Sequence, residues 1–444
     1  MFGLLITTLM MPTANAFCGT YVGGVGAEFY NTYSQLAVVR DNDQTTLTIV
    51  NDVEGNFDSF ALVIPVPEVI PEDKVKVLEP EIFDRLDAYS QPRLVTYTCE
   101  DFEERMDTGL DFDSSVPESG GDPEDNDVNV EALYIVGEFE IVILSATQSD
   151  SLFTWLNDNG YQVPGQSQDL LQQYIDGGSF FLAAKVAANA GIESGDKLSP
   201  LQFAYASDAF QIPIRIGTLN AKEAQDLVVY AVSDYSNGRV GIANSVYREF
   251  SIEDECMWDP VDGQNFGEYF AEQFTNGYEE TEDGAWTVEY AWGGGGCDPC
   301  SGTPPEAADL IALGVNEDLV YYSDYFFTRL HARYTPAQAT EELMLYQSNL
   351  TDQMQYRFIE YKYELENRFP ICGVGMADDP GSCDTDEGHN GNDPSGDGPS
   401  TPDGYTADGS NNTGCGGCSN GGGIAIGTWL LGFWGIRRRA KSHR

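Results

Sequence analysis

One stretch near the C-terminus limits what this chain can fold into. Residues 373–414 consist mainly of Gly, Asp, Pro, Ser, Asn and Thr, and they contain almost no large apolar side chains. Such a composition cannot bury enough apolar surface to offset the entropy lost on ordering. We therefore predict a flexible acidic stalk at 373–423. The hydrophobic core must then be built by residues 17–372, which are numerous enough for a sizeable core.

Within this body the pattern of apolar residues is rich in strands. Residues 36–40 and 46–50 alternate around a turn at 41–43, which predicts a hairpin. Further strands are expected at 60–64, ended by Pro65, and at 94–98, 133–146, 180–187, 202–206, 212–219, 227–232, 240–252 and 353–363. Helices are expected at 80–89, 150–159, 166–175 and 305–313. Strands outnumber helices without regular βα alternation, so we predict an α+β fold with mixed or antiparallel sheets. The length favours two sub-domains.

The N-terminus has the features of an export signal. A short apolar stretch at 2–11 precedes an A-x-A cleavage site, Ala14-Asn15-Ala16, which predicts a signal peptide over 1–16. The basic n-region is missing, because Arg40 is the first basic residue. The body is therefore expected outside the cytoplasm.

The C-terminus has the features of a membrane anchor. Residues 424–436 are uncharged and apolar, and Arg437, Arg438 and Arg439 follow directly. The segment is shorter than the ~20 residues of an ordinary spanning helix. Positive charge resists translocation, so the pattern indicates a stop-transfer segment with a basic cytoplasmic tail at 437–444. A buried core helix is the alternative interpretation. We expect an exported protein of the cell envelope or outer surface, attached to the membrane by this segment.

The charge balance restricts the partners. The chain has 72 acidic residues against 22 Lys plus Arg, a net charge of −50. Nucleic acid is therefore not an expected partner. The acidic stalk leaves weak calcium binding as an alternative, but no window has the oxygen ligands of an EF-hand loop. We predict no cofactor and no metal site.

Export favours disulfides among the nine cysteines. Cys372–Cys383 is a candidate pair by proximity, and Cys18–Cys99 is a candidate by position; the connectivity is otherwise open. Cys297 and Cys300 form a Cys-Asp-Pro-Cys motif, for which a structural loop disulfide is preferred over thiol-disulfide exchange, because no helix begins directly at the pair.

Catalytic residues are not identified by the sequence. His331 is the single histidine of the folded body, so any Ser-His-Asp triad would have to use it. It lies in the alternating run TRLHARY, which favours a packed or surface strand residue instead. Pairs of carboxylates, which glycoside hydrolases use, arise by chance in a chain with 72 acidic residues, so such pairs do not indicate a hydrolase here.

Several segments together resemble one bacterial exported family, the domain of unknown function 2330. They are CGTYVGGVGAEFYNTYSQLAVVRDNDQTTLTIVNDVEG, FALVIPVPEVI, IPIRIGTLNAKEAQDLVVYAVSD, CDPC and FFTRLHARYTP. The resemblance extends from residue 18 to about residue 363. The resemblance implies export, often in myxobacteria and their relatives, and no known activity or catalytic residue.

The C-terminal order Cys-Gly-Gly-Cys, apolar segment and Arg cluster also resembles the C-terminal sorting tails of Gram-negative bacteria, of the myxobacterial or Gly-Gly type. This resemblance implies cutting by an envelope sorting protease and a new anchor at Cys415 or Cys418. We expect a surface binding or structural module. The alternative is an extracytoplasmic enzyme, either a carboxylate-based hydrolase or a thiol-disulfide exchanger that uses Cys297 and Cys300.

Overall fold

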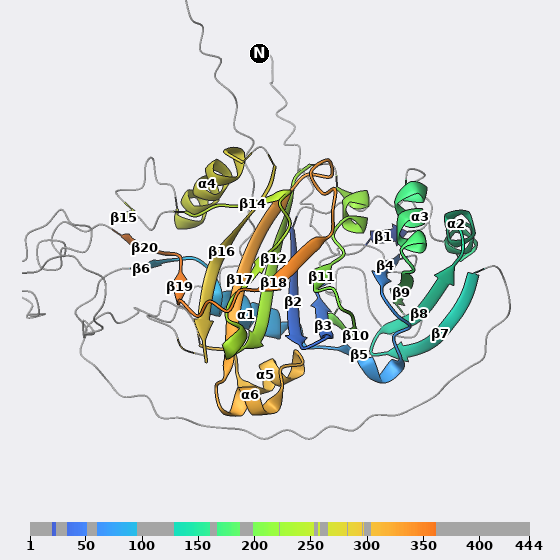
Figure 1. Cartoon of the computed structure of the whole chain (residues 1–444), viewed down its shortest axis with the longest axis horizontal. Helices are drawn as coiled ribbons and strands as arrows, with labels where there is room; N and C mark the ends of the chain where they lie inside the picture. The colour runs from blue at the N-terminus through green and yellow to red at the C-terminus, as the bar shows by residue number, and fades with distance from the viewer. Residues whose placement is uncertain are drawn as a thin grey trace, which may run out of the picture.

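The computed structural model describes most of the predicted body and none of the stalk or the C-terminal segment. The described residues are 20–23, 33–50, 60–95, 128–159, 167–186, 199–221, 223–252, 256–257, 265–281, 283–294, 296 and 303–360. Within them, two large sheets lie side by side and helices cover their outer faces (Figure 1).

The larger sheet has nine strands. They are β2 (Tyr33–Asp41), β3 (Gln44–Ile49), β5 (Val75–Val77), β10 (Leu201–Ala206), β12 (Gln225–Asp234), β14 (Tyr247–Glu249), β16 (Gly284–Gly293), β17 (Tyr325–Tyr334) and β19 (Met354–Gln355). Their order is β14-β16-β17-β12-β2-β3-β10-β5, with β19 beside β16. β12 runs parallel to β2 and antiparallel to β17, so the sheet is mixed.

The second sheet has five antiparallel strands, in the order β1-β4-β9-β8-β7. The strands are β1 (Thr20–Gly23), β4 (Phe60–Val66), β7 (Val128–Val136), β8 (Phe139–Ala146) and β9 (Phe180–Val186). Two three-stranded sheets complete the described strands. One contains β11 (Gln211–Ile212), β18 (Leu343–Gln347) and β13 (Val240–Ile242), and the other contains β15 (Cys256–Met257), β20 (Arg357–Glu360) and β6 (Arg93–Val95).

The helices cover the outer faces of the two large sheets. The described α-helices are α1 (Glu81–Ser90), α2 (Ser149–Asp158), α3 (Gln168–Asp176), α4 (Phe266–Glu279), α5 (Ala307–Ala312) and α6 (Glu317–Tyr321). Short 3-10 turns occur at η2 (Glu72–Lys74), η4 (Ile216–Asn220) and η5 (Tyr235–Asn237). Helices α2 and α3 pack on the five-stranded sheet, and α1 and α5 pack on the nine-stranded sheet.

The largest core lies between the two sheets and draws side chains from both. Leu62, Phe139 and Leu182 of the smaller sheet belong to the same buried cluster as Leu36 and Val229 of the larger one. Three further clusters lie beneath helices: one beneath α1 and α5, one beneath α2 and α3, and one beneath α4. The continuous central cluster favours one cooperative unit, whereas the chain length by itself favours two sub-domains.

Several predicted elements are confirmed, as is the strand-rich α+β class. The hairpin is β2 and β3, which pair from Leu36–Ile49 to Asp41–Gln44 around Asn42, a residue with φ of 53°. The helix expected at 80–89 is α1, and it buries Ile82, Phe83, Leu86 and Tyr89 on one amphipathic face. The helices expected at 150–159, 166–175 and 305–313 correspond to α2, α3 and α5.

Other predicted strands were wrong in extent. The strand expected at 133–146 is a hairpin, β7 and β8, because Gly137 adopts φ of 56° in a two-residue turn. Where a strand was expected at 212–219, the structure has the short strand β11, which ends at Ile212 before Pro213, and then the 3-10 turn η4. The strand expected at 240–252 is broken into β13 and β14.

Strand β4 passes through Pro65, contrary to the prediction. We expected Pro65 to end the strand, but β4 continues to Val66. Among the described residues, β1 pairs with β4 only as far as Val63, and Pro65 pairs with Phe181 of β9. A strand accommodates a proline where it needs no N–H bond on one side.

Among the described residues, none of the helices is both long and apolar enough to cross a membrane. The segment 424–436, for which a membrane span is predicted, lies outside the described residues.

Candidate functional site

Three basic side chains occur at every second position of the buried strand β17. Arg329, His331 and Arg333 have the period of two that places side chains on one face of a strand. This face points away from the central core, because the intervening Leu330 and Ala332 belong to that core. Buried charges require partners, so the triplet predicts carboxylates on the neighbouring elements.

The carboxylates come from two adjacent strands and one helix. Asp226 of β12 lies opposite Arg333, and Asp87 of α1 reaches Arg329 from the covering helix. Glu289 of β16 sits at a β-bulge, since the register with β17 shifts between Val288 and Tyr290. The extra residue of a bulge re-aims a side chain, and here the Glu289 carboxylate reaches Arg329 and His331.

Together these six groups form a continuous row of alternating charge, which we call the buried charge network. Its members are, in spatial order, Asp87, Arg329, Glu289, His331, Asp226 and Arg333. The Arg329 guanidinium bonds Asp87 at 2.6 Å and Glu289 on its other side. The Arg333 guanidinium holds both oxygens of Asp226, at 2.6 and 2.9 Å, in a bidentate pair.

His331 lies at the centre of the buried charge network, and both of its ring nitrogens face carboxylates. Nδ1 is 2.7 Å from Oε1 of Glu289, and Nε2 is 3.2 Å from Oδ1 of Asp226. Two carboxylate acceptors favour the imidazolium, which donates from both nitrogens. With His331 protonated, three cations balance three carboxylates.

The pKa values of the central groups follow from this arrangement. Burial by itself lowers the pKa of His331, but Glu289 and Asp226 outweigh burial and raise it above 6.5. Burial by itself raises the pKa of Asp226, yet Arg333 and His331 hold it at about 2. Burial by itself also raises the pKa of Glu289, but Arg329 and His331 lower it below the ordinary value. Asp226 and Glu289 are therefore ionised at neutral pH, and the two carboxylates favour the protonated form of His331.

Aromatic rings of α4 cover one end of the network. The Phe274 ring stacks on His331 with 3.9 Å between the centroids, and the guanidinium of Arg333 lies 4.7 Å from the same ring. Thr275 of the same helix accepts a hydrogen bond from Arg333 at 3.1 Å. The Glu289 side chain is only 1% exposed. Substrate therefore has no open path to the central carboxylate.

This geometry does not fit the triad that sequence left open for His331. A triad needs a hydroxyl nucleophile on one ring nitrogen and a carboxylate on the other. Carboxylates occupy both positions here. Thr287, whose backbone lies opposite His331, has its hydroxyl 2.7 Å from the phenol oxygen of Tyr356. His331 is a buried strand residue with a positioning role in the fold.

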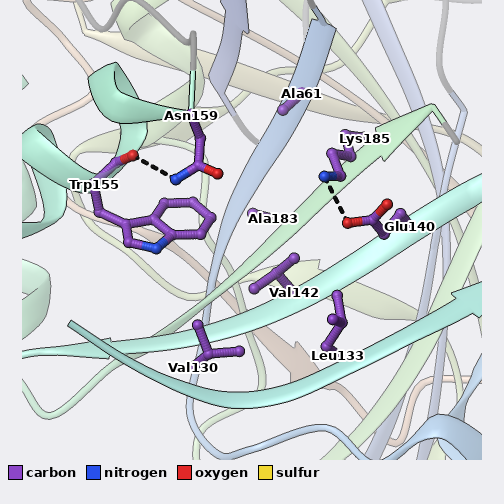
Figure 2. A pocket seen from close by; sticks show the side chains of 9 residues that line it. All are labelled: Ala61, Val130, Leu133, Glu140, Val142, Trp155, Asn159, Ala183 and Lys185. Carbon is purple, nitrogen blue, oxygen red and sulfur yellow. Dashed lines mark hydrogen bonds and ion pairs between the residues drawn. The ribbon is translucent and has the colours of Figure 1, made fainter. Parts of the chain in front are cut away.

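A shallow pocket on the outer face of the five-stranded sheet is a second candidate. It has a volume of about 170 Å³ and opens between the end of α2 and the strands β7, β8, β9 and β4 (Figure 2). The lining residues are Ala61, Val130, Leu133, Glu140, Val142, Trp155, Asn159, Ala183 and Lys185. The volume is well below the ~300–1,000 Å³ of small-molecule sites.

The polar groups of the pocket are paired with one another or with their own helix. Lys185 and Glu140 are direct cross-strand partners and form an ion pair at 2.5 Å. The Asn159 amide donates to the backbone oxygen of Trp155 at 2.8 Å. The remaining lining is apolar, so the pocket suits an apolar group of the size of one side chain, with an ion pair at its rim.

A third titratable group, Glu342, lies between α3 and β18. Its carboxylate accepts from the Tyr174 hydroxyl at 2.6 Å and from the backbone N–H of Arg215 at 3.2 Å. Burial raises the pKa of Glu342 above its ordinary value. The contacts join α3, η4 and the start of β18, which assigns Glu342 to the packing between these elements.

The predicted site residues lie mostly outside the described residues. This holds for Cys18, Cys99, Cys297, Cys300, Cys372, Cys383, Cys415 and Cys418, and for Ala14, Ala16, Arg437, Arg438 and Arg439. Their roles stay predictions. Among the described residues, no group of three or more His, Cys, Asp or Glu side chains could hold a metal ion.

The buried charge network was missed by sequence reasoning, although a signal was present. Arg, His and Arg alternate in a run that otherwise reads as a buried strand, in a chain with only 22 Lys plus Arg. Glu289 likewise stands within the apolar run WTVEYAW, and Asp226 directly precedes the apolar run LVVYAV. Which carboxylate meets which base depends on strand order, which those runs do not encode.

Comparison with known proteins gives a family but no activity. The family described as "Uncharacterized protein conserved in bacteria (DUF2330)" matches residues 12–346. No curated protein matches the chain. Among solved structures, a mutated baculovirus P35 after caspase cleavage is 8% identical, over 48% of this chain and 72% of that one, with a TM-score of 0.25. A likeness of this size carries no argument about fold or function.

Proposed function

The chain belongs to the bacterial DUF2330 family, and from that premise we propose that it is an exported binding or structural module of the cell envelope. The family description names no activity, so the function has to be argued from the residues. The proposal has two parts. One concerns what the folded body does, and the other concerns where the body is held.

The buried charge network carries the first part. It contains the residue types that catalysis most often uses, but its carboxylates and its imidazolium are engaged with one another. A hydrolase that uses two carboxylates needs room between them for a sugar and water. Between Asp226 and Glu289 lies the His331 ring instead. The network thus acts as internal support, and it favours a binding module over a carboxylate-based hydrolase.

The sequence at both ends supports the second part. We propose that a signal peptide at 1–16 directs export, that 373–423 is an acidic stalk, and that 424–436 with Arg437, Arg438 and Arg439 retains the protein in the membrane. The order Cys-Gly-Gly-Cys, apolar segment and Arg cluster favours later processing by an envelope sorting protease, with the anchor at Cys415 or Cys418.

The intact mass of the protein from isolated cell envelopes tests the location. We expect a chain that lacks 1–16 and 424–444 and carries a lipid near Cys415 or Cys418. A mass that retains the three arginines would mean a plain single span and would contradict the sorting tail. A full-length chain recovered from the cytoplasm would contradict export.

Protease treatment of intact cells tests the orientation. The body should be degraded by added protease, while a cytoplasmic control protein stays intact. A body protected in intact cells but cut after the outer membrane is opened would place it on the periplasmic side.

A further inference from the structure

Strand β7 is an edge of the five-stranded sheet and carries exposed apolar side chains. In the part of the chain that the structure describes, β8 is its one neighbouring strand. Leu133 is 41% exposed and Ile135 is 55% exposed, although both belong to a strand. An edge strand presents unpaired backbone N–H and C=O groups, which another extended backbone can satisfy. In Figure 1, β7 is the outermost strand of the five-stranded sheet among the described strands.

The hairpin determines which backbone groups face outward. Val136 and Phe139 flank the two-residue turn at Gly137 and Glu138. In such a hairpin the flanking residues form a hydrogen-bonded pair, and pairs alternate along the ladder. We therefore expect the N–H groups of Leu133 and Ile135 to point away from β8. The regular segment from Ala132 to Val136 follows the bulge between Val130 and Ala132.

The apolar pocket lies beside this edge. Leu133 and Val130 of β7 belong to its lining, and Trp155 of α2 closes the opposite side (Figure 2). Its volume is about 170 Å³, and an engineered apolar cavity of roughly 150 Å³ holds benzene. A strand added along β7 would place alternate side chains on this face, so that one apolar side chain can enter the pocket.

Acidic side chains lie at both ends of the β7 segment from Ala132 to Val136. Glu131 lies at the bulge and is exposed, whereas Glu138 lies in the turn and is half-buried. The Glu131 carboxylate accepts a hydrogen bond from the Ser145 hydroxyl, and the Glu138 carboxylate accepts one from the backbone N–H of Ser199 at 2.8 Å. Neither partner is a cation, so both carboxylates leave negative charge at the edge. Lys185, the cation near the pocket, is already paired with Glu140. The edge therefore favours a basic partner. A second copy paired antiparallel across β7 would place Glu131 near Glu138 of the other copy, and like charges opposite each other are destabilising.

We propose that the edge of β7 binds a basic, extended peptide segment by strand addition, with one apolar side chain in the pocket beside Trp155. The inference rests on the proposed binding function and specifies its partner. The peptide backbone pairs with Ala132–Val136, and its Lys or Arg side chains reach Glu131 and Glu138. Main-chain hydrogen bonds supply affinity, and the pocket and the acidic ends supply specificity.

The test uses the full-length chain in detergent and a phage-displayed library of random twelve-residue peptides. Enriched sequences are synthesised, and their binding is measured by fluorescence anisotropy. We expect the enriched peptides to be basic, with an apolar residue and no proline in the paired segment. An absence of enrichment over the library background would overturn the inference.

Ile135→Pro removes an outward N–H without removing a bond to β8, and its ring blocks an added strand. We expect peptide binding to weaken about tenfold or more. Ile135→Thr is the matched control: it keeps the N–H and the β-branched shape, and binding should stay within about threefold of the wild type. Equal binding by both variants would overturn the proposal.

Ala183→Leu fills the pocket from β9 and leaves the edge intact, so it keeps the proposal testable if the proline variant fails to fold. It should weaken peptides with a large apolar side chain more than peptides with Ala at that position. Light scattering that shows a dimer lost in Ile135→Pro would identify a second copy as the occupant and overturn the peptide. Neither result would alter the intact mass of the protein from cell envelopes or its accessibility to protease. Failure of the peptide proposal can therefore be distinguished from failure of the proposed location.

Discussion

His331 illustrates how strongly one residue depends on its neighbours. A buried neutral imidazole would leave Glu289 and Asp226 with insufficient positive charge, and a buried imidazolium without them would be costly. Held between the two carboxylates at 2.7 and 3.2 Å, the protonated ring balances the network. Removing one member of a buried, bonded set leaves the others uncompensated, and this is the costly event.

The stability of the protein should therefore depend on the protonation of His331. Its pKa is raised in the folded state above the ordinary 6.5. The contribution to the free energy of unfolding is then complete below pH 6.5 and is lost as pH rises through the folded value. The Asp226 contribution behaves oppositely: it is present above 3.8 and is lost as pH falls toward about 2. We expect the urea midpoint of the wild type to decline from pH 6.5 to 9.

His331→Asn should lower the free energy of unfolding by about 3–5 kcal/mol at pH 6, and the decline between pH 6.5 and 9 should disappear. His389→Asn is the control, because His389 lies in the predicted stalk, and it should leave both the midpoint and its pH dependence unchanged. If the decline persists in His331→Asn, another group is responsible for it.

At the scale of elements, α4 both packs on the sheet and shields the network. The helix begins with a capping box in which Asn265 and Glu268 exchange side-chain and backbone hydrogen bonds. Phe274 is the fully buried residue of this helix and lies on His331 and Arg333. Phe270, one turn earlier, instead contacts Tyr356 and Phe358.

Phe274→Ala should expose the buried charge network to water. We expect a loss of about 3–5 kcal/mol in the free energy of unfolding, faster amide exchange across Phe266–Glu279 and a weaker pH dependence of stability. Water around His331 weakens its attraction to the carboxylates. Exchange mass spectrometry and urea unfolding at pH 6 and 9 measure these effects.

Phe270→Ala is the matched control within the same helix. It removes an equal ring and should also destabilise the protein, but it should leave the pH dependence as in the wild type. Identical pH profiles for the two variants would show that α4 does not shield the network.

At the scale of the whole molecule, the central core joins the two large sheets. Phe139 of the five-stranded sheet and Phe326 of the nine-stranded sheet belong to one buried cluster, and both are fully buried. Side chains that pack together across two sheets lose their contacts together, and this favours a single cooperative transition.

Scanning calorimetry should therefore show one transition for the described body. Phe139→Leu and Phe326→Leu should each lower its midpoint, at a cost of roughly 1–1.5 kcal/mol, and should shift the same peak. Tyr321→Leu changes a side chain that is 81% exposed and should leave the midpoint unchanged. Two peaks, each shifted by one core variant only, would support the two sub-domains that the chain length favours.

Local sequence was sufficient for elements whose apolar pattern is short-range. The β2–β3 hairpin and the amphipathic face of α1 follow from alternation and from the spacing of Ile82, Phe83 and Leu86. Local sequence was insufficient where a turn depends on the backbone angle of one residue, as at Gly137. It was also insufficient where tertiary packing determines whether a segment is a helix or a strand, as in α4. Helix α4 was missed because its aromatic residues are as compatible with strands as with helices.

The amino-acid sequence by itself determined the fold class, several elements and the expected address of the protein, because periodicity, charge runs and stalk composition act over neighbouring residues. Only the tertiary structure decided the two candidate sites. Asp87, Asp226, Glu289 and Arg329 meet because strand order and one bulge bring residues up to 242 positions apart into contact. Among the described strands, β7 likewise forms an edge because the order of strands ends there. Strand order is set by the burial of whole faces against each other, and no local pattern encodes it.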